Sequence, residues 1–194
     1  ILKEKKPLLV YTSSPHRGLD ILLNIFPSII KRFPETRLKV FSGIKGMHNL
    51  PDNFEHLYDL CRKTPGVEYI GPVSQKRLAR ELKPALVLAY PVAIWETFCI
   101  NAAEAMTAGC HVITNALGAL PETTAGFADL IEVENVDPQE YINTFINLTI
   151  NCLNSFKSDR DRLEKSLREQ VDFCYHNYTW ELKAQEWEEK IFNG

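Results

Sequence analysis

The chain has 194 residues, and its shares of 45% hydrophobic and 24% charged residues are typical of an ordinary soluble globular protein. The formal net charge of -3 gives no support to nucleic-acid binding, which usually leaves a basic face, and no apolar run approaches the ~20 residues of a membrane-spanning helix. The five cysteines include no C-x-x-C pair, which argues against a zinc site and a disulfide framework and favours a reducing, cytoplasmic compartment.

Short apolar runs alternate with segments of helical periodicity through most of the chain. We expect strands at residues 8–11, 38–41, 67–70, 86–90, 112–114 and 130–133. Helices are expected at residues 19–33, 53–62, 74–83 and 97–108, the third capped by Ser74 and the last ended by Gly109. This alternation predicts an α/β fold, a Rossmann-like parallel sheet of about six strands with helices on both faces.

No strand signal returns after Pro138, and helices are expected at residues 139–154, 159–175 and 180–192. We therefore predict one domain over residues 1–194, with a core at about 7–155 and C-terminal helices at about 156–194. The chain begins at Ile1 with the polar run Lys3-Glu4-Lys5-Lys6, which looks like a cut in an interdomain linker. We expect an N-terminal domain of the same protein to be absent from this chain.

The loop after the first strand is one candidate site, because ligands bind at the carboxyl ends of the strands in an open parallel sheet. This loop contains Ser13, Ser14, Arg17 and Gly18. Gly18 lets the chain turn close to a ligand, and Arg17 can meet a phosphate with two parallel hydrogen bonds. A turn with a solvated arginine is the alternative interpretation.

The loop after the fourth strand leads into a helix for which Thr97 is the expected N-cap. A helix start offers unpaired N–H groups and partial positive charge, which suit a diphosphate. Glu96 lies just outside this helix, at the mouth of the expected site.

Glu104 lies further along the same helix, among alanines and with no cation three or four residues away. A carboxylate buried on so apolar a helix is costly without partners. Either Glu104 lies on an exposed stripe, or it bonds to a ligand. A ribose whose diphosphate sits at the helix start, about 10 Å away along the axis, could reach it.

The residues from Glu96 to Gly109 read E-T-F-C-I-N-A-A-E-A-M-T-A-G, which resembles the E-x7-E signature of retaining GT-B glycosyltransferases of the group 1, or family 4, type. His111-Val112-Ile113-Thr114 matches the strand that follows the signature, and residues 118–122 resemble its G-G-x-P-E loop. Residues 13–20 resemble the opening loop, where a basic residue precedes Gly-Leu. The resemblance implies the C-terminal, donor-binding domain of a GT-B fold.

The resemblance also implies roles for individual residues. Glu96 would contact hydroxyls of the donor sugar, and Glu104 would bind the ribose. Backbone N–H groups of residues 98–100 (Phe98, Cys99 and Ile100) would bind the distal phosphate, next to Ser14, Gly18 and Thr97. Arg17 stands in the place of the family's phosphate-binding lysine. From these implied roles, Arg17 and Glu96 are the expected catalytic residues. The backbone near Val73 would meet the base, and the helix around Trp180 resembles the segment that crosses back to the N-terminal domain.

Three positions depart from the family pattern. Thr12 stands where an arginine is frequent, Cys99 replaces a glycine, and Ala119 replaces the second glycine of G-G-x-P-E. A nucleophilic role for Cys99 is the sharper alternative, but no base with a recognisable pattern accompanies it. His16 and His48 match no catalytic position of the family and are expected to be loop residues.

The predicted function is transfer of a sugar from a nucleotide-diphospho-sugar, with the retention of configuration that the family implies. We expect no cofactor, and the resemblance implies that no metal is bound. The sequence also lacks an obvious Asp-x-Asp metal clamp, because Asp159-Arg160-Asp161 has this pattern but lies in the C-terminal helical region. The expected partners are the nucleotide-sugar donor, an acceptor that is a glycan, a lipid-linked sugar or a protein, and the N-terminal domain. Peripheral membrane association of the full-length protein is left open. This chain alone should be inactive, and the alternatives are a GT-B-type sugar-nucleotide epimerase and a non-catalytic nucleotide-sugar-binding module.

Overall fold

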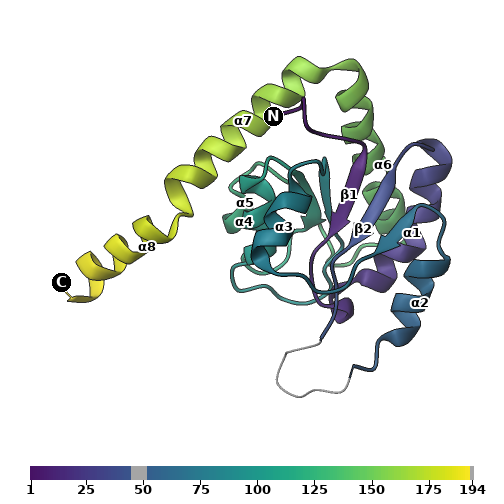
Figure 1. Cartoon of the computed structure of the whole chain (residues 1–194), viewed down its shortest axis with the longest axis horizontal. Helices are drawn as coiled ribbons and strands as arrows, with labels where there is room; N and C mark the ends of the chain where they lie inside the picture. Colours follow the sequence, from purple (N-terminus) through teal and green to yellow (C-terminus); the bar gives the residue numbers. More distant parts are fainter. Residues whose placement is uncertain (45–51, 193–194) are drawn as a thin grey trace.

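The computed structural model describes residues 1–44 and 52–192, and its centre is a parallel sheet with strand order β3-β2-β1-β4-β5-β6 (Figure 1). The strands are β1 (Leu8–Tyr11), β2 (Arg37–Val40), β3 (Val67–Tyr69), β4 (Val87–Tyr90), β5 (His111–Asn115) and β6 (Asp129–Ile131). Every pairing between neighbouring strands is parallel. The predicted fold class, a Rossmann-like parallel sheet with helices, is confirmed.

The strand order reverses between β1 and β4, which lie side by side although β2, β3 and the helices α1, α2 and α3 separate them in the sequence. Leu9 pairs with Val87 and Val10 pairs with Leu88. Both strands are buried along their whole length, which explains why each reads as an unbroken apolar run rather than an alternating one. The two loops singled out in the sequence therefore leave the sheet next to each other.

Helices cover both faces of the sheet (Figure 1). Among the described residues, α1 packs against α2 and α6, whereas α4 packs against α5 and α7. Their bounds are α1 (Leu19–Arg32), α2 (Glu55–Lys63), α3 (Gln75–Leu82), α4 (Ile100–Thr107), α5 (Leu120–Thr124), α6 (Pro138–Ser158), α7 (Arg160–Asn177) and α8 (Trp180–Trp187), with short turns η1 (Pro15–Arg17) and η2 (Glu188–Phe192). The sequence did not predict η1 or α5. No helix in the described part of the chain is both long and apolar enough to cross a membrane.

The last helix, α8, extends away from the sheet at the end of α7 (Figure 1). The helix predicted at residues 180–192 begins at Trp180 as expected, and the side chains of Trp180 and Trp187 are exposed. The segment at the opposite end of the chain also differs from expectation, because Lys5 is buried in spite of its place in a polar run. Its Nζ donates to the carbonyl oxygens of Ala108 at 2.8 Å and Leu82 at 3.4 Å, at the ends of α4 and α3.

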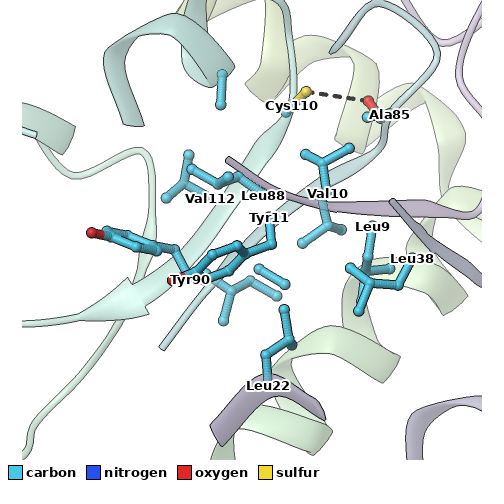
Figure 2. Close-up of a cluster of buried hydrophobic side chains, with 14 of the residues drawn as sticks. Leu9, Val10, Tyr11, Leu22, Leu38, Ala85, Leu88, Tyr90, Cys110 and Val112 are labelled. Atoms are coloured by element: carbon cyan, nitrogen blue, oxygen red, sulfur yellow. Dashed lines mark hydrogen bonds between the residues drawn. The ribbon is translucent and has the colours of Figure 1, made fainter. Parts of the chain in front are cut away.

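The core is centred on β1 and β4 (Figure 2). The rings of Tyr11 and Tyr90 are fully buried, and their centroids lie 5.9 Å apart at an interplanar angle of 57°. These two tyrosines are the last residues of their strands. Each therefore has a ring in the core and a hydroxyl at the edge of the sheet where the loops begin.

Gly18 begins α1 in a left-handed conformation, with φ of 105°. A Cβ at this position would lie 2.1 Å from the carbonyl oxygen of Pro91. We predict that Gly18→Ala lowers the free energy of unfolding by more than ~2 kcal/mol, because it adds a backbone clash to the conformational strain. Gly126→Ala is the control, since Gly126 has φ of 83° and nothing within 4 Å of its Cβ position, and it should cost only ~1 kcal/mol. Equal losses in urea unfolding would contradict the proposed close approach.

All five cysteine thiols are buried. Burial raises the pKa of the thiol of Cys61 to about 11 and those of Cys99 and Cys152 to about 12, and it also raises the pKa values of Cys110 and Cys174. Because the thiolate is the reactive form, we predict that no thiol of the folded chain reacts rapidly with Ellman's reagent at neutral pH. The same assay in denaturant should titrate all five. A rapid reaction of Cys99 alone would support the nucleophilic alternative.

Candidate functional site

A pocket of about 470 Å³ lies where the loops after β1 and β4 meet. Its lining consists of residues from four segments of the chain: Thr12, Ser13, Ser14, Arg17, Phe41, Gly43, Pro72, Val73, Leu78, Glu96, Thr97, Phe98, Cys99, Ile100 and Asn101. Eight of the ten predicted site residues are in this lining, and the other two, Gly18 and Glu104, are not. The pocket lies at the carboxyl ends of the strands, at the point where the strand order reverses, as expected for an open parallel sheet.

An ion pair between Arg17 and Glu96 joins the two loops. Nη1 of Arg17 donates to Oε1 of Glu96 at 2.5 Å, and the same oxygen accepts a second hydrogen bond, from the hydroxyl of Tyr90, at 2.5 Å. The hydrogen bond with Glu96 raises the pKa of Arg17 above its already high value. The Glu96 side chain is only 9% exposed, whereas that of Arg17 is 32% exposed. The carboxylate is therefore the fixed member of the pair and the guanidinium the accessible one.

The backbone of Glu96 is held by the loop after β5. The N–H of Ala119 donates to the carbonyl oxygen of Glu96 at 2.8 Å. A Cβ at Gly118 would lie 2.3 Å from that same oxygen, so no side chain fits at this position. Ala119 has an ordinary conformation, with φ of -82°. The second glycine of the G-G-x-P-E loop, replaced here by Ala119, is thus not needed to hold the backbone of Glu96. The first glycine, Gly118, is needed.

Polar side chains at the end of β5 anchor the start of the β4 loop. Thr114 donates through Oγ1 to the carbonyl oxygen of Tyr90 at 2.7 Å, and Asn115 donates through Nδ2 to that of Val92 at 2.5 Å. The Asn115 amide is oriented by the hydroxyl of Tyr141, which donates to its Oδ1 at 2.8 Å. Sequence reasoning missed these residues, although polar side chains closing an otherwise apolar strand are a visible signal.

The start of α4 differs from the prediction, and the assignment of Thr97 as its N-cap is wrong. The helix begins three residues later, at Ile100, after Cys99 in a left-handed conformation with φ of 70°. The preceding loop is fixed elsewhere, because the hydroxyl of Thr123 donates to the carbonyl oxygen of Phe98. Thr97 still lines the pocket.

Cys99 occupies a conformation that glycine adopts without strain, so its backbone follows the course that a glycine would take. Its thiol is directed to the side-chain oxygen of Asn101, 2.8 Å away. The N–H groups of Ala102 and Ala103 both bond to the carbonyl oxygen of Cys99. Among the described residues, nothing accepts from the N–H groups of Ile100 and Asn101, which remain available at the pocket.

Glu104 lies one turn into α4 and is half-buried. Desolvation raises the pKa of its carboxyl group. It forms no side-chain hydrogen bond or ion pair with any residue that the structure describes. The exposed stripe that was one alternative is therefore not observed, and the carboxylate is partly removed from water without a partner.

The remaining expectations concern the far end of the pocket and the histidines. Val73 lies beside Pro72 and Leu78 in the lining, and Ser74 caps α3 as predicted, accepting from the N–H of Arg77 at 3.4 Å. The His16 ring lies against that of Phe54 and outside the pocket lining. His48 lies outside the described residues.

Within residues 1–44 and 52–192, no cluster of three or more His, Cys, Asp or Glu side chains has the arrangement of a metal site. Asp159 and Asp161 lie at the beginning of α7 and are exposed. The two glutamates of the Glu96–Gly109 segment differ: the Glu96 carboxylate is paired with Arg17, whereas the Glu104 carboxylate has no partner among the described residues.

The chain has similar sequences among known proteins. It is 26% identical over 199 aligned positions to D-inositol 3-phosphate glycosyltransferase of Nocardioides sp., an alignment that covers 95% of this chain and 41% of the relative. The chain thus spans about two fifths of the length of that relative.

Solved structures with the same fold include an Anabaena protein, HepE, in complex with UDP-glucose. Its TM-score is 0.71 at 15% identity, with 96% of this chain and 49% of that one covered. The C-terminal domain of a glycosyl transferase group 1 family protein from Francisella tularensis aligns with a TM-score of 0.66 at 16% identity, covering 91% of this chain and 88% of that one.

The family model described as "Glycosyl transferases group 1" matches residues 6–151, which include all six strands and the whole pocket lining. The sequence resemblance, the strand order and the family match agree. The chain therefore belongs to the group 1 glycosyl transferases.

Proposed function

We propose that this chain is the donor-binding half of a glycosyltransferase that transfers a sugar from a nucleotide-diphospho-sugar, with retention of configuration. The observation that carries the proposal is the combination of an accessible arginine, a helix start with free N–H groups and a fixed carboxylate around one pocket. Retention of configuration rests on the family resemblance.

The diphosphate of the donor would bind between Arg17 and the start of α4. The N–H groups of Ile100 and Asn101 point from a helix whose partial positive charge favours anions. The Arg17 side chain is 32% exposed, so it would be able to turn from Glu96 to a phosphate oxygen. Ser14 and the backbone N–H groups of Phe98 and Cys99 would complete this end of the pocket.

The two glutamates would bind the two sugars of the donor. Glu96 has one oxygen occupied by Arg17 and Tyr90, which leaves the other for a hydroxyl of the transferred sugar. Glu104 would bind the ribose, which would supply the hydrogen bonds that the protein does not. Because α4 begins at Ile100, Glu104 is only ~6 Å along the axis from the helix start, closer than the sequence-based estimate. The base would lie near Val73, Pro72 and Leu78.

In the transfer step, negative charge develops on the departing nucleoside diphosphate. Arg17 and the N–H groups of Ile100 and Asn101 would stabilise this charge electrostatically, in place of a metal ion. The glutamates would hold the sugar and the ribose in the reactive orientation. The UDP-glucose complex of the Anabaena structure supports a nucleotide-sugar as the ligand of this fold.

The proposal also concerns the acceptor of the transferred sugar. A glycan, a lipid-linked sugar or a protein would meet the donor at an N-terminal domain of the full-length protein. This chain covers 41% of the length of one relative, which leaves room for such a domain. We propose a cytoplasmic location, with membrane association open to the full-length protein. This chain alone would bind the donor without transferring the sugar.

Isothermal titration of the chain with UDP-glucose, GDP-mannose and ADP-glucose tests the proposal. We expect one base to be preferred, and the corresponding nucleoside diphosphate to bind as well, because the pocket has a separate phosphate end. Mass spectrometry of the nucleotide after incubation should show no transfer and no epimerisation. Absence of binding to all three sugar nucleotides would contradict the proposed function.

Glu104→Gln should weaken binding of the preferred nucleotide about ten- to a hundredfold, because a hydrogen bond to a charged group contributes ~1.5–3 kcal/mol. The same change should leave the melting temperature at neutral pH unchanged or raise it. Burial raises the pKa of Glu104, so its favourable contribution to stability is present at acidic pH and is lost as the pH rises through that value.

Glu169→Gln is the matched control, because Glu169 is exposed on α7 with only a 3.9 Å ion pair to Lys165. It should change neither affinity nor melting temperature. A lower melting temperature for Glu104→Gln at neutral pH would show that Glu104 serves the fold rather than the ligand.

A further inference from the structure

Tyr90 does not line the pocket and belongs to neither the sequence resemblance nor the expected donor contacts, but its hydroxyl contacts two lining residues, Ser13 and Glu96. Its ring is fully buried beside that of Tyr11 (Figure 2). Its backbone carbonyl accepts from Thr114 on the neighbouring strand. The core thus encloses the ring, and the neighbouring strand fixes the backbone of the same residue.

The hydroxyl of Tyr90 contacts both loops of the pocket. It donates to Oε1 of Glu96 at 2.5 Å and lies 3.2 Å from Oγ of Ser13. Burial is the main cause of a raised pKa for the phenol, so the hydroxyl keeps its proton and remains a donor at physiological pH. Among the described residues, the second carboxylate oxygen of Glu96 has no partner.

Arg17 shares the same oxygen of Glu96, but it is not suited to hold the carboxylate during binding. It is the accessible member of the ion pair, and a diphosphate in the pocket would compete with Glu96 for its charge. If Arg17 turned toward the phosphate and nothing replaced it, the Glu96 carboxylate would be free to rotate. Tyr90 cannot turn away, because its ring is enclosed in the core.

We propose that Tyr90 is a positioning residue for the donor sugar: it fixes one oxygen of Glu96 so that the other faces the sugar when Arg17 turns to the diphosphate. The inference rests on the proposed function and assigns different roles to the two residues that bond to Glu96, Arg17 and Tyr90. Arg17 responds to the phosphates, and Tyr90 keeps the carboxylate in place. Tyr90 acts only through Glu96 and touches no reacting atom.

The test compares two ligands on the same chain. Titrations use UDP-glucose with UDP, GDP-mannose with GDP, and ADP-glucose with ADP, and the preferred pair is carried forward. Tyr90→Phe removes the hydroxyl and keeps the ring. It should weaken binding of the sugar nucleotide about tenfold, the usual effect of losing a hydrogen bond to a charged group, and leave the affinity for the nucleoside diphosphate within about twofold.

Tyr58→Phe is the matched control. Tyr58 is a buried tyrosine whose hydroxyl also donates to a carboxylate, that of Asp52, at 3.0 and 3.1 Å, but neither residue lines the pocket. Removal of the Tyr58 hydroxyl should change neither the affinity for the sugar nucleotide nor that for the nucleoside diphosphate. In a Glu96→Ala background, Tyr90→Phe should have no further effect on the sugar nucleotide, because the residue acts through Glu96.

A parallel loss of both affinities in Tyr90→Phe, including a loss through failure to fold, would assign the hydroxyl to the fold alone and overturn the inference. Unchanged affinity for the sugar nucleotide would overturn it as well. If the unmodified chain bound none of the six ligands, the proposed function would fail first. Binding by the unmodified chain with no selective loss in the variant would refute only the role of Tyr90.

Discussion

The pairing of β1 with β4 is the constraint on which the site depends. It brings together two strands that are far apart in the sequence and sets their carboxyl ends at one edge of the sheet. The loop that carries Arg17 and the loop that carries Glu96 can meet only because of this pairing. The core residues that fix it, Tyr11 and Tyr90 among them, are therefore as much a part of the site's geometry as the residues that line the pocket.

Much of this could be predicted from the sequence, and the failures have physical reasons. All six strands were located, β1 and β4 because buried strands appear as apolar runs and the others because short β-rich runs alternate with helical segments. The loops after β1 and β4 followed from the topology. Thr97 was assigned as an N-cap from its residue type, but the loop is held by tertiary contacts from Gly118 and Thr123, which no local pattern reveals. The partners of Glu96 were missed for the same reason: Tyr90 reads as the last residue of a core strand, and its hydroxyl has meaning only once the loop folds back over it.

The pocket end of the sheet contains unpaired and strained groups that the core does not contain to the same degree. Glu104 is partly desolvated without a partner, Cys99 has a positive φ, and the N–H groups at the start of α4 are unsatisfied within the described chain. Each feature opposes folding. In the proposed complex, the carboxylate would bind the ribose, the N–H groups would bind the diphosphate, and the positive φ would let the backbone approach the ligand closely. The extensive buried core offsets these costs, so local strain and unpaired groups persist at this edge of the sheet.

Gly118 illustrates how far such a site extends in the sequence. It has no side chain and lies 22 positions from Glu96, yet the space that its missing Cβ leaves open is occupied by the backbone of that glutamate. Any substitution there would displace the carboxylate without touching a ligand. In a mutational survey, substitutions of Gly118 would therefore have the same effect as substitutions in the pocket itself. The number of side chains tolerated at Gly118 would measure how accurately the position of Glu96 must be held.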